Sequence, residues 1–132
     1  MKSYIADTNF YLRFLLQDNI KQAKKAELYL KKAKKGDIRI IFLPAVILEM
    51  NFVLKTVVSV PRVEIANQLT NLIKTTYVEI EDRDTWLETL HFYKNYNIDL
   101  LDIFLFFKAK KENAEVLSFD RDFVKLKRKL KD

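Results

Sequence analysis

The chain has 132 residues, a formal net charge of +6 and a calculated isoelectric point near 9.4. With 49% hydrophobic and 32% charged residues, it can build a core and is not a candidate for global disorder. It contains no cysteine, which excludes disulfides, thiolate metal sites and a cysteine nucleophile. No apolar stretch reaches the roughly 18 residues of a membrane helix, and no secretory signal opens the chain. We therefore predict a single cytoplasmic domain over residues 1–132, without membrane contact.

Short apolar runs alternate with longer helical stretches along the chain. We predict helices at about 8–17, 20–35, 44–58, 62–75, 83–96, 100–113 and 121–130, and strands at 4–6, 39–43, 77–80 and 115–119. Gly36 predicts the end of the second helix, and Pro44 and Pro61 fit the first turns of the next two. The alternation predicts an α/β fold, with a parallel sheet of four to five strands and helices on both faces. Ligands of such sheets bind outside the carboxyl ends of the strands.

Positive charge is concentrated in two segments. Residues 20–36 carry seven lysines against the single acid Glu27, and the segment from Lys125 to the end carries five basic residues against Asp132. Such faces are either solvated helix surfaces or contacts to a polyanion such as nucleic acid. The sequence leaves these two interpretations equally open.

Four carboxylates lie in apolar surroundings. Asp7 follows the first predicted strand, and Asp120 follows the last one in "VLSFDRDF". Glu49 is the only charge in "LPAVILEMNFVL", and Asp102 lies within "IDLLDIFLFF". All four contexts are unusual, because burying an unpaired carboxylate is costly.

Helix capping is the simplest alternative for three of these acids. Asp7 and Asp120 each precede a predicted helix and can accept hydrogen bonds from its first backbone N–H groups. Asp99 and Asp102 are spaced three apart, as in a capping box, and an acid there also complements the helix dipole. Taken singly, each of these acids is better explained as a cap than as a metal ligand.

Glu49 cannot be explained as a cap, because it lies about five residues into its predicted helix. That helix is apolar on nearly every face, which is typical of a buried or interfacial helix. A carboxylate there needs a cation, and either a basic side chain such as Arg13 or a metal ion would serve.

Taken together, the four acids predict a metal site. Asp7 and Asp120 end two strands, and Asp102 lies in the first turn of the helix before the second of these strands. If they meet near Glu49, their repulsion raises their pKa values, and a divalent cation relieves it. Ligands that are all oxygens select Mg²⁺ or Mn²⁺. Such a site on a basic protein is typical of phosphodiester hydrolysis.

The ordered set of motifs resembles the PIN domain family, of the kind found in VapC-type toxins of prokaryotic toxin–antitoxin pairs. The similarity spans residues 3–123 and rests on "ADTN", the acid in "LPAVILEMNFVL", "DLLDIFLFFKAK" and "VLSFDRDF" in this order. "DTN" alone is a weak motif, whereas the ordered set is specific. The chain departs from the family in ending with "VKLKRKLKD", where members often add a short strand.

The resemblance implies a Mg²⁺- or Mn²⁺-dependent ribonuclease with Asp7, Glu49, Asp102 and Asp120 as catalytic metal ligands. Asp120 would hold a second ion or orient water. The resemblance assigns supporting roles to four further residues: Thr8, Asn9, Ser118 and Asp122. It also implies an RNA substrate, an antitoxin partner and a homodimer. A PIN nuclease of RNA processing, and a basic nucleic-acid-binding domain without catalysis, remain as alternatives.

Overall fold

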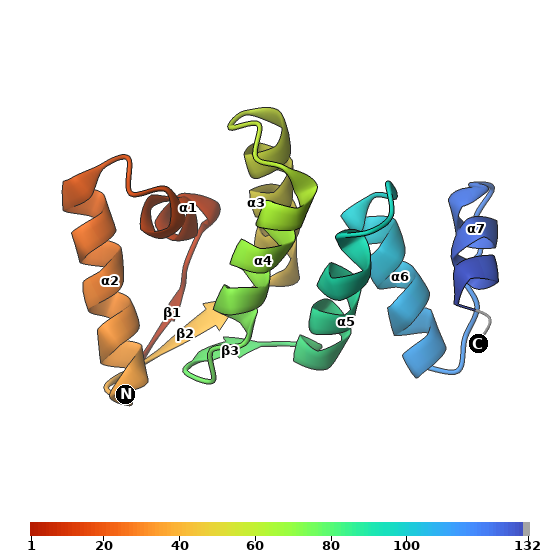
Figure 1. Cartoon of the computed structure of the whole chain (residues 1–132). Helices are drawn as coiled ribbons and strands as arrows, with labels where there is room; N and C mark the ends of the chain where they lie inside the picture. Colours follow the sequence, from red (N-terminus) through yellow and green to blue (C-terminus); the bar gives the residue numbers. More distant parts are fainter. Residues whose placement is uncertain (131–132) are drawn as a thin grey trace.

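The sheet of the computed structural model, which describes residues 1–130, has three parallel strands (Figure 1). They are β1 (Lys2–Ile5), β2 (Ile38–Phe42) and β3 (Val78–Ile80), hydrogen-bonded in the order β1-β2-β3. Helices connect successive strands, as parallel pairing requires. The predicted α/β class with a parallel sheet is confirmed.

Seven helices occur within residues 1–130, and each lies where the sequence predicts it, with ends within three residues. They are α1 (Thr8–Leu16), α2 (Ile20–Lys34), α3 (Pro44–Thr56), α4 (Arg62–Ile73), α5 (Arg83–Tyr93), α6 (Leu100–Lys111) and α7 (Asp122–Lys129). The helix ends follow local chemistry. Asn19 accepts a hydrogen bond from the N–H of Gln22 at the start of α2, and Gly36, at φ +83°, ends it. None of these helices combines the length and apolar character needed to cross a membrane.

The two faces of the sheet differ in their surroundings. Ile40 and Phe42 of β2 are fully buried on one face, where the ring of Tyr11 from α1 stacks on Phe42 at 4.2 Å between centroids. On the other face, Arg39 donates hydrogen bonds to Glu79 and Ser3, and all three side chains are exposed. In Figure 1, α5, α6 and α7 lie beyond the β3 end of the sheet, away from β1.

The helices α5 and α6 form a rigid pair that is attached to the centre of the molecule. Trp86 of α5, which is fully buried, stacks on Phe104 of α6 with ring centroids 4.0 Å apart. Arg62 at the start of α4 donates hydrogen bonds to the backbone carbonyls of Tyr93, Tyr96 and Ile98, at 3.2, 2.8 and 2.8 Å. These bonds hold the connection between α5 and α6, residues 94–99, in place.

The fourth predicted strand, residues 115–119, is not part of the sheet. The chain turns after α6 at Asn113, which has φ +54°, and the following segment lies between α6 and α7 without regular secondary structure. Because strand structure requires a hydrogen-bonded neighbour, the segment forms no strand at this distance from β1. Its apolar side chains, which the sequence predicts to be buried, are instead exposed at Leu117 (99%) and Phe119 (109%).

Candidate metal centre

Asp102 is positioned by the first turn of α6. Leu100 and Ile103 on either side of it are buried, and this anchors the turn and leaves the Asp102 side chain half-buried at the surface. Asp99 occupies the N-cap position, but its side chain makes no capping hydrogen bond. The capping-box interpretation of these two acids is therefore not realised in this turn.

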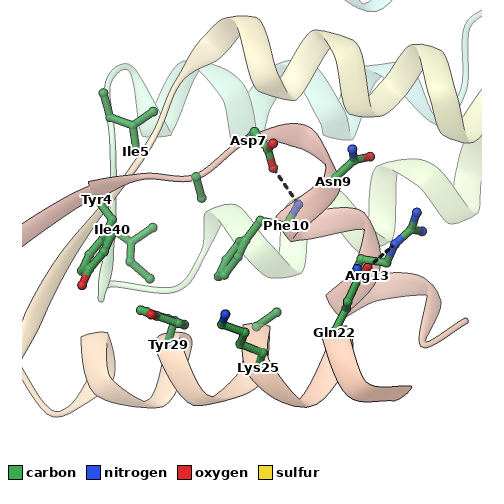
Figure 2. Close-up of a pocket in the computed structure, with 12 residues that line it drawn as sticks. Tyr4, Ile5, Asp7, Asn9, Phe10, Arg13, Gln22, Lys25, Tyr29 and Ile40 are labelled. Carbon is green, nitrogen blue, oxygen red and sulfur yellow. Dashed lines mark hydrogen bonds between the residues drawn. The ribbon is translucent and has the colours of Figure 1, made fainter. Parts of the chain in front are cut away.

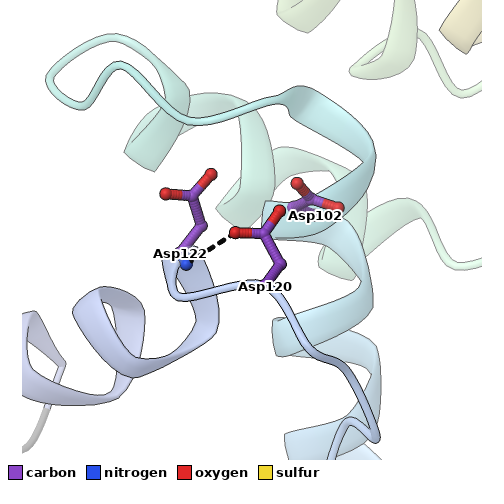
Figure 3. Close-up of side chains that lie close together, drawn as sticks. All are labelled: Asp102, Asp120 and Asp122. Carbon is purple, nitrogen blue, oxygen red and sulfur yellow. Dashed lines mark hydrogen bonds between the residues drawn. The ribbon is translucent and has the colours of Figure 1, made fainter.

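Asp120 and Asp122 belong to the turn that leads into α7. The Ser118 Oγ accepts a hydrogen bond from the backbone N–H of Asp120 at 2.9 Å. Asp120 in turn accepts one from the N–H of Asp122, also at 2.9 Å, which forms an Asx turn before α7. The N-cap of α7 is Arg121 and no side chain caps the helix, so the predicted cap by Asp120 is not formed. Figure 3 shows the carboxylate of Asp120 between those of Asp102 and Asp122.

The three carboxylates form one cluster. One oxygen each from Asp102, Asp120 and Asp122 lies within 4.8 Å of the other two. Partial burial raises the pKa of Asp102 above its ordinary value, and the neighbouring charges of Asp99, Asp120 and Asp122 raise it further. Three converging carboxylate oxygens fit a hard divalent cation such as Mg²⁺ or Mn²⁺, which prefers oxygen ligands.

Burial and the neighbouring acids disfavour the charged form of Asp102, so replacing it with a neutral residue should stabilise the metal-free protein. Since the pKa of Asp102 is raised by folding, the charged form destabilises the folded state at neutral pH, and this penalty disappears as the pH falls through the folded-state pKa. We expect Asp102→Asn to raise the melting temperature of the metal-free protein by about 1–3 °C at pH 7. The difference from wild type should shrink in a second melt at lower pH, as the pH falls through the raised pKa of Asp102. Thermal melts in chelator at both pH values measure this, and a lower melting temperature at pH 7 would contradict it.

Asp7 lies outside this cluster, at the start of α1. Its Oδ1 accepts a hydrogen bond from the N–H of Phe10 at 2.9 Å, so the capping interpretation is realised. Thr8 is buried, whereas the exposed Asn9 lines a cavity of about 490 Å³ between β1 and α2 (Figure 2). In Figure 1, this end of the sheet and the turn before α7 lie at opposite sides of the molecule.

Glu49 also lies outside the cluster, and its surroundings differ from those predicted. The helix α3 buries only Ile47, Met50 and Leu54, and Glu49 lies on the exposed side. Arg13, the proposed cation for Glu49, instead pairs with Asp18 at 3.0 Å. The argument that Glu49 needs a cation because it is buried was therefore wrong.

Asp122 has a larger part in the cluster than the sequence assigned to it. It was predicted only to support Asp120, but one of its carboxylate oxygens lies within 4.8 Å of oxygens of both Asp102 and Asp120. The signal was the spacing "DRD" at the start of a predicted helix, where an Asx turn brings residues i and i+2 to the same side.

Comparison with known proteins gives one finding about the family. Residues 4–129 match the family model described as PIN domain, which covers most of the chain. No curated protein and no solved structure matches the chain significantly.

Proposed function

The chain belongs to the PIN domain family, and we propose that it is a Mg²⁺- or Mn²⁺-dependent endoribonuclease. PIN domains are generally nucleases that use divalent metal ions, so membership implies a hydrolase acting on nucleic acid. We further propose that the nucleic acid is RNA and that the protein acts in the cytoplasm. We take residues 1–132 to act as one domain.

The observation that carries this proposal is the cluster of Asp102, Asp120 and Asp122 on a basic chain. A site that concentrates negative charge is unfavourable for a polyanionic substrate unless a cation neutralises it. The net charge of +6 favours nucleic acid, while the cluster supplies the oxygen ligands for the ion.

The proposed roles follow from the position of each side chain. Asp102, Asp120 and Asp122 would hold the ion. Asp7 and Glu49 are proposed as further ligands on the family pattern, with Thr8 and Asn9 bracing Asp7. When bound, the ion would polarise a phosphoryl oxygen and lower the pKa of water. The hydroxyl of Ser118 holds the backbone of Asp120, and thus keeps its carboxylate directed towards Asp102.

Two basic helices are the proposed contacts to the RNA backbone. α2 has Lys31, Lys32 and Lys34 in its last turn, and α7 ends with Lys127, Arg128 and Lys129. Both are solvent-exposed stretches, so they can approach phosphates without a conformational change. Binding through them should weaken as salt rises.

A role as the toxin of a toxin–antitoxin pair is a further part of the proposal. It is supported by exposed apolar side chains on and after α3 and on α4, which suit a protein partner: Phe52 (61%), Val57 (72%) and Val63 (50%). An antitoxin covering this surface would be expected to shift these residues to a buried state.

Thermal melting with and without millimolar Mn²⁺ tests the metal site directly. An ion at about 100 times its Kd stabilises the folded chain by about 2.7 kcal/mol, so the wild type should melt several degrees higher. Asp120→Asn should lose most of this shift. Asp7→Asn lowers the baseline through its lost cap, so only its metal-dependent shift reports on the site. A wild type that does not respond to Mn²⁺ would favour the non-catalytic nucleic-acid-binding alternative.

A further inference from the structure

A stripe of basic side chains runs along one face of α7. Arg121, Lys125 and Arg128 follow one another at i, i+4 and i+7, and Arg121, just before the helix, already has helical angles of φ −69° and ψ −16°. This spacing places the three side chains on one face. All three residues are exposed, whereas Leu126, which anchors the other side of the helix, is fully buried. The stripe therefore faces solvent along the helix.

The stripe begins at the carboxylate cluster. Arg121 lies between Asp120 and Asp122 in sequence, and Figure 3 shows α7 leading away from these two acids and from Asp102. The members of the stripe are spaced by roughly 5 Å along the helix axis, and the stripe is one side chain wide. These dimensions suit a single polyanionic strand, which would reach the cluster at the N-terminal end of the helix.

The charges of the stripe are available to such a strand. Within the described residues 1–130, neither Arg121 nor Arg128 pairs with an acid. The other basic residues of α7 have neighbours in the protein. The ammonium group of Lys129 lies 4.4 Å from the centre of the Tyr96 ring, and Lys127 lines the space between α6 and α7. The stripe is therefore the part of α7 that best suits a phosphate backbone.

Lys125 is the member of the stripe that reaches the cluster. Its Nζ lies 3.7 Å from Oδ1 of Asp122, whose carboxylate also approaches Asp102 and Asp120. The side chains of Lys125 and Asp122 are 63% and 31% exposed, and an exposed ion pair at this distance is weak. The ammonium group can therefore leave Asp122 with little loss of stability once an ion binds the carboxylate oxygens.

The charge of the cluster creates a need for a nearby cation. Three ionised carboxylates outweigh the charge of a single divalent ion, so a phosphate that approaches the ion is still repelled. Negative charge grows further on the phosphoryl oxygens as water attacks, and a cation held nearby stabilises it. A lysine ammonium suits this role, because it is compact, has three donors and is carried by a flexible stem.

We propose that the stripe binds the backbone of a single-stranded RNA and that Lys125 contacts the phosphate next to the ion, an inference that rests on the proposed function. Without metal, Lys125 stays with Asp122. With metal, its ammonium group donates hydrogen bonds to a non-bridging phosphoryl oxygen and transfers no proton. Arg121 and Arg128 bind neighbouring phosphates of the same strand, so the strand runs along α7.

The salt dependence of RNA binding tests the stripe without metal or activity. Each phosphate contact on a single strand contributes about 0.7 to the slope of log affinity against log salt. In chelator, Arg121→Met combined with Arg128→Met should therefore reduce the slope for a labelled single-stranded oligoribonucleotide by about 1.4, measured by fluorescence anisotropy. Lys55→Met combined with Lys74→Met removes the same charge from exposed positions at the ends of α3 and α4 and should keep the wild-type slope. An unchanged slope in the arginine double variant would overturn the stripe.

Lys125→Met should have opposite effects on the two ligands. The variant removes an ammonium group that competes with the ion for Asp122, so Mn²⁺ affinity without RNA should rise about twofold to fivefold. RNA affinity at saturating Mn²⁺, measured by stopped-flow anisotropy before cleavage, should fall about tenfold. Arg128→Met, one turn farther along the stripe, should leave Mn²⁺ affinity unchanged. A lysine with a structural role alone would lower both affinities, and that result, or no change in either, would overturn the phosphate contact.

Two outcomes separate this inference from the proposed function. If RNA binding depends on the stripe but the wild type neither responds to Mn²⁺ nor cleaves RNA, the nuclease proposal and the role of Lys125 are refuted, and the RNA contacts of Arg121 and Arg128 remain. If the wild type binds Mn²⁺ and cleaves RNA, but Lys125→Met equals Lys74→Met in RNA affinity and cleavage rate, Lys125 is no substrate contact and the nuclease proposal stands.

Discussion

Asp102→Asn should reduce metal-dependent RNA cleavage by about 100-fold to 1,000-fold while the protein remains folded. Asp102 is the most constrained member of the cluster, because the buried residues Leu100 and Ile103 fix its turn. A bound ion supplies several kcal/mol of transition-state stabilisation, and each 1.36 kcal/mol corresponds to about tenfold in rate. Single-turnover cleavage of a labelled RNA at saturating Mn²⁺ measures the loss.

Two readouts of this variant change in opposite directions, and this separates a functional from a structural role. Asp102→Asn is expected to melt slightly higher than wild type without metal but to cleave far more slowly with it. Sites that bind charged ligands are commonly destabilising in their empty form. Asp84→Asn is the matched control, since Asp84 is an exposed acid in the first turn of α5. Its cleavage rate should stay within about twofold of wild type, and equal losses in both variants would contradict the assignment of Asp102.

The local features of the fold were predictable because they depend on neighbours in sequence. Gly36 ends α2 in the left-handed conformation that glycine adopts without strain, and Pro44 begins α3. The segment 115–119 was predicted as a strand from its apolar character, but it forms no strand, and only Val116 in it is partly buried. Whether it pairs depends on where α6 carries it, which is decided by distant contacts such as the Trp86–Phe104 stack.

The candidate site, like the fold, was predictable in the parts that depend on neighbours in sequence. The turn containing Asp120 and Asp122 is local, and it approaches Asp102 because the connection between α6 and α7, residues 112–121, returns to the start of α6. The position of Glu49 was misjudged because an apolar helix does not reveal which of its faces is covered. In α3, Phe52 is 61% exposed, although it is as hydrophobic as the buried Met50 and Leu54. The relation of Asp7 to the cluster depends on tertiary pairing and stays a prediction.

The second large effect is expected at Arg62, which lies outside the site. Arg62 donates to the carbonyls of Tyr93, Tyr96 and Ile98, and its guanidinium lies 3.8 Å from the centre of the Tyr93 ring. Arg62→Met keeps the length of the side chain but leaves three carbonyls without this donor. We expect a loss of about 3 kcal/mol in the free energy of unfolding, on the order of 10 °C in melting temperature. Chemical denaturation and thermal melting measure it.

The consequence for metal binding distinguishes Arg62 from an ordinary stabilising residue. The connection that Arg62 holds leads directly into Asp99 and the first turn of α6, so its loosening should also disperse the cluster around Asp102. Mn²⁺ affinity in Arg62→Met should fall about tenfold, as with other residues that support metal ligands. Arg83 is the matched control, because it donates to the carbonyls of Ile73, Thr75 and Val78 at the opposite end of α5. Arg83→Met should be similarly destabilised but should keep its Mn²⁺ affinity, measured by titration below the melting temperature of both variants. If the two variants lose affinity equally, Arg62 acts on the whole fold and has no specific part in positioning Asp102.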